Sequence, residues 1–316
     1  MDSNWLFNSS SVLTSCPGKR NHSAFRALGT SGATTAECSA ISKERSAACA
    51  WGLSRLGAFG LRSIATKPND KQARDCYNFS VARSIEVIET ARLDPWDRAL
   101  DVPARNGNYS ITVSNSNLDR NPANYELIPA DTIVIGGTYF ERRITLEGIG
   151  ASVVAVGREE KKDFRQSFTS RRLYATATGI VRFNDHHVEL EFSLPFQTER
   201  VSLDGHEYPL AADFTAPLAV GLVRERPEKL GFARMTRPEK FADTARLTRL
   251  QMYDRNRIPV IFVHGLQDTP ASWTPMINAL YEDPDIRRRY QFWVFNYPSG
   301  YPYPYSAALF AKNSTG

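Results

Sequence analysis

The feature that most constrains the fold is the segment from 258 to 266, in which the apolar run Ile-Pro-Val-Ile-Phe-Val is followed at once by His264, Gly265 and Leu266. The four residues from Val260 to Val263 are all apolar, which predicts a central strand of a parallel sheet covered on both faces. Gly265 allows a sharp turn at the carboxyl end of that strand. Open α/β sheets bind their ligands at this edge, so the loop at 264–266 is a candidate functional site.

The residues after this loop predict a helix and a second strand. Thr269 is a suitable N-cap and Pro270 a suitable first helical residue. Apolar residues then recur at helical spacing and predict a core-facing stripe made of Trp273, Met276, Ile277, Leu280 and Tyr281. The run from Tyr290 to Phe295 predicts the next strand, so the order is strand, helix, strand, which is typical of a right-handed parallel crossover.

Two passages, IPVIFVHGLQDTPASWTPMINAL and RRRYQFWVFNYPSGYPYPYSAAL, together cover most of residues 258–310. They resemble the N-terminal part of an α/β-hydrolase of the lipase and esterase type, of the bacterial kind with a long N-terminal extension. The resemblance reaches back through YPLAADFTAPLA at 208–219. It implies that the backbone NH of Leu266 is an oxyanion-hole donor and that His264 and Gly265 shape the loop. It also implies that His264 is not the catalytic base, because the triad histidine of that family comes last in the chain.

The nucleophile that the resemblance calls for is absent from these residues. No Gly-x-Ser-x-Gly occurs in the 316 residues, and Ser54, in Gly-Leu-Ser-Arg-Leu-Gly, lacks both the spacing and a preceding strand. The serine, acid and histidine are therefore expected beyond Gly316. We expect the chain to be the N-terminal fragment of a serine hydrolase that cleaves carboxylic esters or lipids through a Ser-His-Asp triad, and to be inactive alone.

Two other functions remain open at this point. One is a binding or assembly module attached to a non-catalytic hydrolase scaffold. The other is a dehalogenase-like hydrolase with aspartate as its nucleophile. Because so few strands of a parallel sheet cannot cover both faces, we also expect local instability after residue 257. Tyr301, Tyr303 and Tyr305 are predicted to pack around a proline-interrupted turn rather than to line a pocket.

The fold class expected for the whole chain is α/β, with the beginning of a hydrolase sheet at its C-terminal end. The periodicity of the sequence changes along the chain and predicts five parts. They are a low-complexity, disordered segment at 1–68, an amphipathic helix at 69–99, a β-rich domain at 100–220, a helical linker at 221–256 and the truncated hydrolase part at 257–316.

Local patterns support the second and third of these parts. Tyr77, Val81, Ile85, Ile88 and Ala91 recur at steps of three and four residues, as one face of a helix requires. Apolar residues alternate with polar ones from 187 to 192, which predicts a half-buried strand, and Asp-Gly at 204–205 predicts a hairpin turn. The run at 131–135, Asp-Thr-Ile-Val-Ile, predicts a further strand.

Composition excludes several classes of partner. The hydrophobic fraction of 42% and the charged fraction of 23% are those of a soluble globular protein. The net charge of +5 comes from scattered arginines and not from a one-signed stripe, so no nucleic-acid partner is predicted. Arg287, Arg288 and Arg289 form the one purely basic run, which predicts a solvated helix end.

No metal or cofactor is predicted, and the expected partner is a small ester or lipid. Adjacent residues on a strand point to opposite faces, so His186 and His187 cannot easily share one ion. The compartment stays open between the cell envelope and the cytoplasm. Leu-Thr-Ser-Cys at 13–16 is similar to the site at which bacterial lipoproteins are acylated on cysteine, here Cys16, but the residues before it lack a basic region and a continuous apolar stretch. Membrane association is expected only if this match is real. The other cysteines are Cys38, Cys49 and Cys76, and no spacing among the four is typical of zinc.

Overall fold

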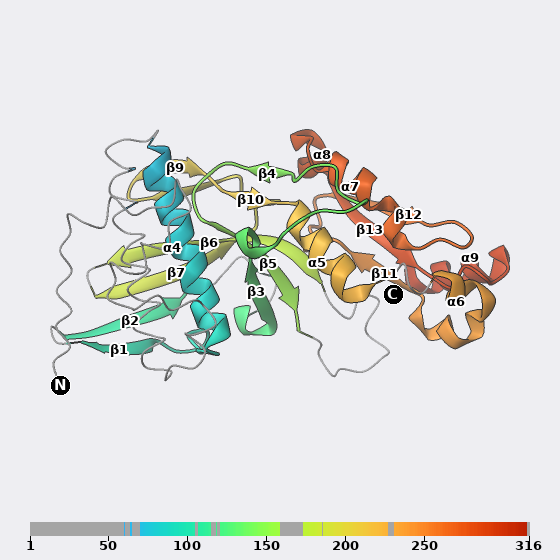
Figure 1. Cartoon of the computed structure of the whole chain (residues 1–316), viewed down its shortest axis with the longest axis horizontal. Coiled ribbons are helices and arrows are strands. Elements are labelled where there is room, and N and C mark those ends of the chain that lie inside the picture. The colour runs from blue at the N-terminus through green and yellow to red at the C-terminus, as the bar shows by residue number, and fades with distance from the viewer. Residues whose placement is uncertain are drawn as a thin grey trace.

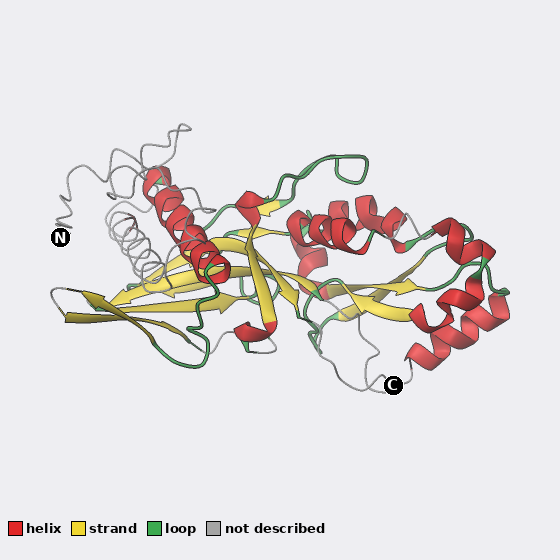
Figure 2. Ribbon diagram, turned by 60° about the horizontal axis from the view of Figure 1, so that its bottom comes forward, coloured by secondary structure: helices red, strands yellow, loops and turns green. Residues whose placement is uncertain are grey.

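The structure is a computed structural model that describes Gly60, Ile64 and residues 70–104, 107–114, 118, 121–158, 173–184, 186–226 and 231–314. These residues form both helices and strands, with ten consecutive strands between α4 and α5, so the mixed α and β character expected from the sequence is present (Figures 1 and 2). The described α-helices are α4 (Lys71–Thr90), α5 (Thr215–Glu225), α6 (Gly231–Thr236), α7 (Thr274–Leu280), α8 (Pro284–Arg289) and α9 (Tyr303–Ser314).

The larger sheet has six strands in the order β1-β2-β7-β6-β5-β3. Its strands are β1 (Leu100–Ala104), β2 (Gly107–Val113), β3 (Tyr125–Pro129), β5 (Ala151–Gly157), β6 (Tyr174–Asn184) and β7 (His187–Ser193). The pair β2–β7 is parallel and the other four pairs are antiparallel. The predicted alternation in β7 is confirmed, because Val188, Leu190 and Phe192 are buried.

Two small two-stranded sheets accompany it. The first is a hairpin of β8 (Arg200–Leu203) and β9 (His206–Pro209), and the second pairs β4 (Thr145–Leu146) with β10 (Ala212–Asp213). The Asp-Gly turn predicted for the hairpin is confirmed. Asp204 and Gly205 both have positive φ, 49° and 79°, which is the backbone that a two-residue turn of this kind needs.

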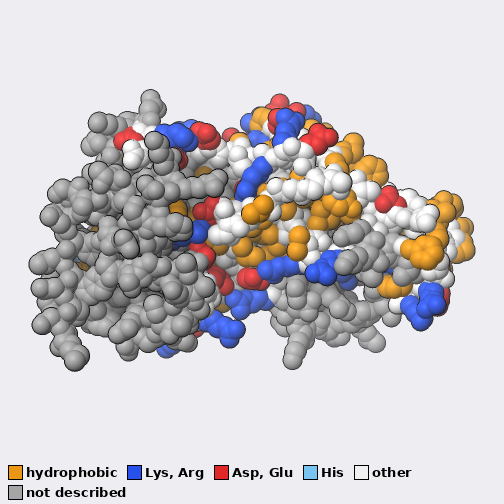
Figure 3. Space-filling model, in the orientation of Figure 1, with side chains coloured by type: hydrophobic (Ala, Val, Ile, Leu, Met, Phe, Trp, Pro, Cys, Tyr) orange, Lys and Arg blue, Asp and Glu red, His pale blue; other side chains and the backbone are white. Residues whose placement is uncertain are grey.

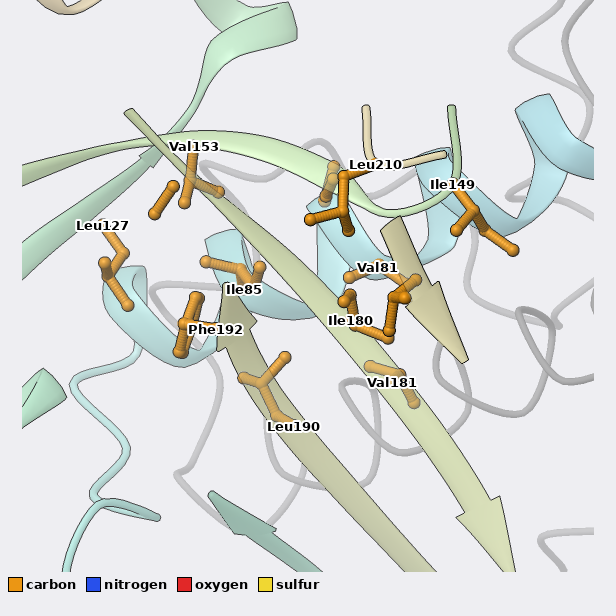
Figure 4. Packing of buried hydrophobic residues seen from close by; sticks show 14 of the residues in the cluster. Val81, Ile85, Leu127, Ile149, Val153, Ile180, Val181, Leu190, Phe192 and Leu210 are labelled. Carbon is orange, nitrogen blue, oxygen red and sulfur yellow. The ribbon is translucent and has the colours of Figure 1, made fainter. Parts of the chain in front are cut away.

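Helix α4 packs against the larger sheet and closes its core. The carboxylate of Asp70 caps the helix by accepting a hydrogen bond from the NH of Ala73, 3.0 Å away. The predicted stripe is confirmed, with Tyr77, Val81, Ile85 and Ile88 all buried. Figure 4 shows Val81 and Ile85 directed at side chains of β6 and β7, including Ile180, Leu190 and Phe192. The phenol of Tyr77 also donates to the carbonyl of Val181 at 3.0 Å and accepts from its NH at 2.9 Å, which fixes the helix on the sheet.

A second sheet of three strands, in the order β11-β13-β12, is formed by the C-terminal third of the chain. Its strands are β11 (Arg246–Arg249), β12 (Ile258–Val263) and β13 (Tyr290–Asn296). The strand-helix-strand prediction is confirmed in that β12 and β13 pair in parallel, with Val263 opposite Phe295. On one face Phe262 and Phe292 pack with Ile277 and Tyr281 of the intervening segment, and on the other Phe295 packs with α9.

Helix α5 and the residues before it connect the two sheets, because Ala216 of α5 packs in one cluster with Val154 of β5 and Leu218 packs in another with Phe262 of β12. Ile144 and Phe214, which precede residue 220, pack in the same cluster as Phe262 and Tyr281, and the Phe214 and Tyr281 rings have centroids 6.0 Å apart. Thr215 donates a buried hydrogen bond of 2.7 Å to the side-chain oxygen of Asn278 on α7. The predicted domain boundary at 220 therefore falls inside α5, a helix that belongs to the packing of both sheets.

Three local predictions are wrong. Residues 131–135 are not a strand but a 3-10 turn, η2 (Ala130–Thr132), followed by irregular chain. The apolar residues at 133–135 pair with no described strand, and Val134 is 96% exposed. The linker at 221–256 is not wholly helical, because β11 lies within it and pairs with β13. Met276 does not belong to the core stripe, since it is 51% exposed.

The basic run at 287–289 is only partly the solvated helix end that was predicted. It forms the last turn of α8, and Arg288 and Arg289 are exposed. Arg287 is buried, donates hydrogen bonds to the carbonyls of Tyr281 and Glu282, and places its guanidinium 4.8 Å from the Phe214 ring centre. Pattern alone missed this, because an arginine that ties two main-chain carbonyls to an aromatic ring looks like any other charge in the sequence.

The cysteines and the N-terminal segment bear on the cellular compartment of the protein. Cys76 of α4 is buried and disulfide-bonded, whereas Cys16, Cys38 and Cys49 lie outside the described residues. The predicted disorder of 1–68 and the acylation match at 13–16 lie outside them too, apart from Gly60 and Ile64. Among the residues that the structure describes, none of the helices combines the length and the apolar character needed to cross a bilayer.

Candidate functional site

The loop that follows β12 is fixed at both of its ends by hydrogen bonds to the segment that follows β13. The phenol of Tyr297 donates to the carbonyl oxygen of His264 at 2.7 Å. Three residues further along the loop, the NH of Gln267 donates to the hydroxyl of Ser299 at 3.2 Å. Tyr297 and Ser299 are themselves buried, so these two anchors are part of the packed structure.

Between the two anchors the loop leaves main-chain donors unused. Within the described part of the chain, neither the NH of Gly265 nor that of Leu266 donates a hydrogen bond. Both residues are exposed, and Leu266 is 61% exposed. Free amides between fixed points are the arrangement that a preorganised anion or oxyanion site requires.

His264 lies under the loop rather than in solvent. It is buried and its ring stacks on Tyr297, with ring centroids 4.4 Å apart and planes 19° apart. Its Nδ1 lies 3.1 Å from the carbonyl of Gly265, and because a carbonyl can only accept, Nδ1 carries the proton in the neutral ring. Burial lowers the pKa of His264 below its ordinary value, opposed in part by that hydrogen bond. A neutral, stacked imidazole suits a residue that shapes the loop.

Gly265 does not serve the purpose that the sequence suggested. Its φ is not positive, and the residue in the left-handed region is Gln267, at φ 62°. The sharp turn therefore comes two residues later than predicted, at the residue whose NH is fixed by Ser299. A Cβ placed on Gly265 would meet nothing within 4 Å, so the space in front of this residue is open.

Strand β12 is not the covered central strand that its apolar run predicted. In the described part of the chain it pairs only with β13, and its other edge carries no strand. Phe262 is buried, but Ile258, Ile261 and Val263 are 54%, 36% and 47% exposed. Figure 3 shows hydrophobic side chains at the surface on the right of the view, the side on which Figure 1 places β12 and β13.

The structure thus brings His264, Gly265 and Leu266 together as one loop at the carboxyl edge of β12 and β13. It adds two residues that sequence reasoning missed, Tyr297 and Ser299. The available signal was their position, because they directly follow the neighbouring parallel strand and must therefore reach the same edge. The packing predicted for the three tyrosines at 301–305 is present in part: the rings of Tyr301 and Tyr305 lie with centroids 4.5 Å apart, whereas Tyr303 is 76% exposed.

The adjacent histidines His186 and His187, from which no metal site was predicted, contact other side chains. His187 makes side-chain hydrogen bonds to Ser110 and Thr112, at 2.8 and 2.9 Å, and His186 stacks on Tyr109 with centroids 4.7 Å apart. Over the described ranges no three residues among histidine, cysteine, aspartate and glutamate come together as a metal site would require.

A cleft of about 930 Å³ lies away from this loop, on the larger sheet. Its walls come from the C-terminal end of α4, the turn after it and β3, and they include Glu89, Trp96, Leu127 and Arg158. Glu89 is mostly buried, and one carboxylate oxygen lies 3.5 Å from Arg158. The other oxygen has no hydrogen-bond partner. Burial raises the pKa of Glu89 to about 7, against the lowering effect of Arg158.

Comparison of this chain with protein-family models, with curated proteins and with solved structures finds no match.

Proposed function

We propose that this chain carries the oxyanion loop of a serine hydrolase that cleaves carboxylic esters or lipids, with the NH of Leu266 as a donor. The observation that carries the proposal is the loop itself, anchored at His264 and Gln267 while the amides between them stay free and exposed. Preorganised donors of this kind act on the negative charge that develops as serine attacks an ester carbonyl. The nucleophile would come from residues that this sequence does not contain.

The surroundings of the loop support the same proposal. The three-stranded sheet has β11 at one edge and β12 at the other, and the outer edge of β12 carries no described strand, so a further parallel strand could pair there. Such a strand would make β12 the point at which the strand order reverses, and ligands of open α/β sheets bind at that point. The exposed Ile261 and Val263 would then be covered, as their apolar character requires.

The test uses the gene as it stands in its source and the protein made from it. We expect the codons after Gly316 to encode Gly-x-Ser-x-Gly followed by an aspartate and a histidine, and the resulting protein to react with a fluorophosphonate probe and to hydrolyse p-nitrophenyl esters. An aspartate in the serine position would favour the dehalogenase-like alternative. Absence of both nucleophiles, together with no labelling, would leave the hydrolase proposal without support.

A second experiment tests the role of Leu266 directly. Leu266→Pro removes the NH and should lower kcat by about 10²- to 10³-fold, the usual effect of losing one oxyanion donor. Leu266→Ala keeps the NH and should lose far less. If the two variants lose equal activity while both remain folded, the donor is not Leu266.

The alternative of a binding module is favoured by a separate observation, the cleft beside α4. A cavity of about 930 Å³ with one buried carboxylate and a tryptophan in its walls has the size and mixed polarity of small-molecule sites. Ligand binding in this cleft is compatible with catalysis at the loop, because the two lie on different sheets, but the alternative as predicted also requires a non-catalytic scaffold. Ligand-dependent shifts in the melting temperature of the full chain, lost in Trp96→Ala, would support it.

A further inference from the structure

Arg234 of α6 is a buried cation without a counter-ion. The residue is 6% exposed, and its one hydrogen bond in the described part of the chain runs from Nη1 to the side-chain oxygen of Asn296, at 2.6 Å. The guanidinium carbon lies 5.8 Å from the ring centre of Phe241. Its Nε is buried with no hydrogen-bond partner, and no described carboxylate forms an ion pair with it.

This arrangement is unusual for an arginine. The surroundings of Arg234 disfavour its positive charge. Burial lowers the pKa of the guanidinium most, and the positive charge of Arg246 lowers it further. Arginine does not shed its proton in proteins, so the charge persists. Buried charges in proteins are generally paired, since an unpaired one costs several kcal/mol. A negatively charged group from outside the described residues would remove that cost.

The guanidinium lies at the same sheet edge as the oxyanion loop. Asn296, its hydrogen-bond partner, is the last residue of β13 and follows Phe295, which pairs with Val263, the residue before His264. The positive charge of Arg234 also contributes to the lowered pKa of His264. Helix α6 packs so closely on the loop after β13 that the backbone of Met235 leaves no room for a Cβ on Gly300.

We propose that Arg234 makes the carboxyl edge of β12 and β13 an anion site that takes a carboxylate, next to the free amides of Gly265 and Leu266. Asn296 and Phe241 hold the guanidinium in place, and its planar fork matches the two oxygens of a carboxylate. The identity of the substrate rests on the proposed hydrolase function. If the anion site binds part of that substrate, the substrate is an ester whose acid or alcohol part also carries an ionised carboxylate.

The anion site is tested without hydrolysis, on the full chain. Acetate and succinate are titrated at constant ionic strength, with sodium chloride as the reference salt, while the ¹⁵N signal of the Arg234 Nε–H group is followed. We expect that signal to shift with saturation for the carboxylates and not for chloride. Arg234→Met should weaken carboxylate binding at least tenfold. The matched control is Arg237→Met, which removes an exposed arginine three residues later and should leave binding intact.

Two results would overturn the inference. One is a wild-type Nε–H signal that does not respond to carboxylates, a measurement that needs no variant and so stands even if Arg234→Met does not fold. The other is equal carboxylate affinity in a folded Arg234→Met protein. The outcome is independent of the proposed hydrolase function, because carboxylate binding without ester cleavage removes only that function, and ester cleavage without carboxylate binding removes only the anion site.

Discussion

Strands β6 and β12 are both rich in apolar residues but have different surroundings. In β6, Ala177, Ile180 and Val181 are 0–2% exposed, with β5 and β7 on its two edges and α4 packed over it. In β12, Ile261 and Val263 remain 36% and 47% exposed, with one neighbouring strand. An apolar run therefore indicates that a strand is suited to burial on both faces. Whether it is buried depends on which other elements are present to cover it.

The largest difference between the two strands should be seen in a matched pair of substitutions. Ile180→Ala removes a fully buried side chain and should lower the free energy of unfolding by roughly 2–5 kcal/mol, because it leaves a cavity in a closed core. Ile261→Ala, in the exposed position of β12, should cost less than about 1 kcal/mol. Urea unfolding of both variants measures the two values. Equal losses would mean that β12 is covered as fully as β6.

A pH effect on stability is expected from a buried carboxylate beside the larger sheet. The pKa of Glu89 is raised to about 7 by burial, from an ordinary value of 4.5. The folded protein therefore holds a proton that the unfolded chain releases, and this contribution to stability is complete below pH 4.5 and is lost as the pH rises through 7. The loss should be on the order of 2 kcal/mol, after allowance for the residual exposure of the side chain.

Glu89→Gln should remove this part of the pH dependence, because the amide does not titrate. Glu207→Gln, at an exposed position of β9, serves as the control and should keep the wild-type profile. Unfolding free energies measured between pH 4 and pH 8 decide the matter. A wild-type profile in Glu89→Gln would show that another group is responsible.

Two adjacent arginines of α8, one buried and one exposed, should also differ in how much their substitution lowers the free energy of unfolding. Arg287→Ala leaves the carbonyl oxygens of Tyr281 and Glu282 without their donor and should lower the free energy of unfolding by roughly 1–2 kcal/mol. Arg288 is exposed and pairs at the surface with Asp285, so Arg288→Ala should change it by less than about 0.5 kcal/mol. Thermal unfolding compares the two. The ranking fails if Arg288→Ala is the more destabilising variant.

Much of the fold could be predicted from periodicity. The helix predicted at 69–99, which the structure shows at 71–90, and the hairpin turn at 204–205 follow from spacing, because each depends on residues close in sequence. The parallel pair β12–β13 follows from the order strand, helix, strand. Strand β11 and the exposure of Met276 could not be predicted, since they depend on which neighbour a segment meets in space. The irregular chain at 133–135 has strand-like residues but no partner strand, and apolar composition alone cannot show that.

The candidate site was predicted in position but not in detail. The apolar run and His-Gly located the loop at 264–266. They did not show that Gln267, and not Gly265, takes the left-handed backbone, or that Tyr297 and Ser299 anchor the loop. These contacts join segments about 30 residues apart, and only the parallel pairing of β12 with β13 brings them together. Arg234 enters the same edge from still further away in the sequence, and no motif marks it.

The smallest expected effect concerns the free edge of β12 and bears most directly on the comparison with β6. Alternate amides of an edge strand point away from its partner, so hydrogen exchange of those in β12 should be fast, while amides of β13 and β6 are protected at least 100-fold more strongly. Val263→Lys should change the free energy of unfolding by less than about 0.5 kcal/mol. It should nevertheless reduce self-association, measured by sedimentation, because a lysine on an open edge disfavours pairing with another chain. Protection of β12 equal to that of β6 in the monomer would show that the edge is covered after all.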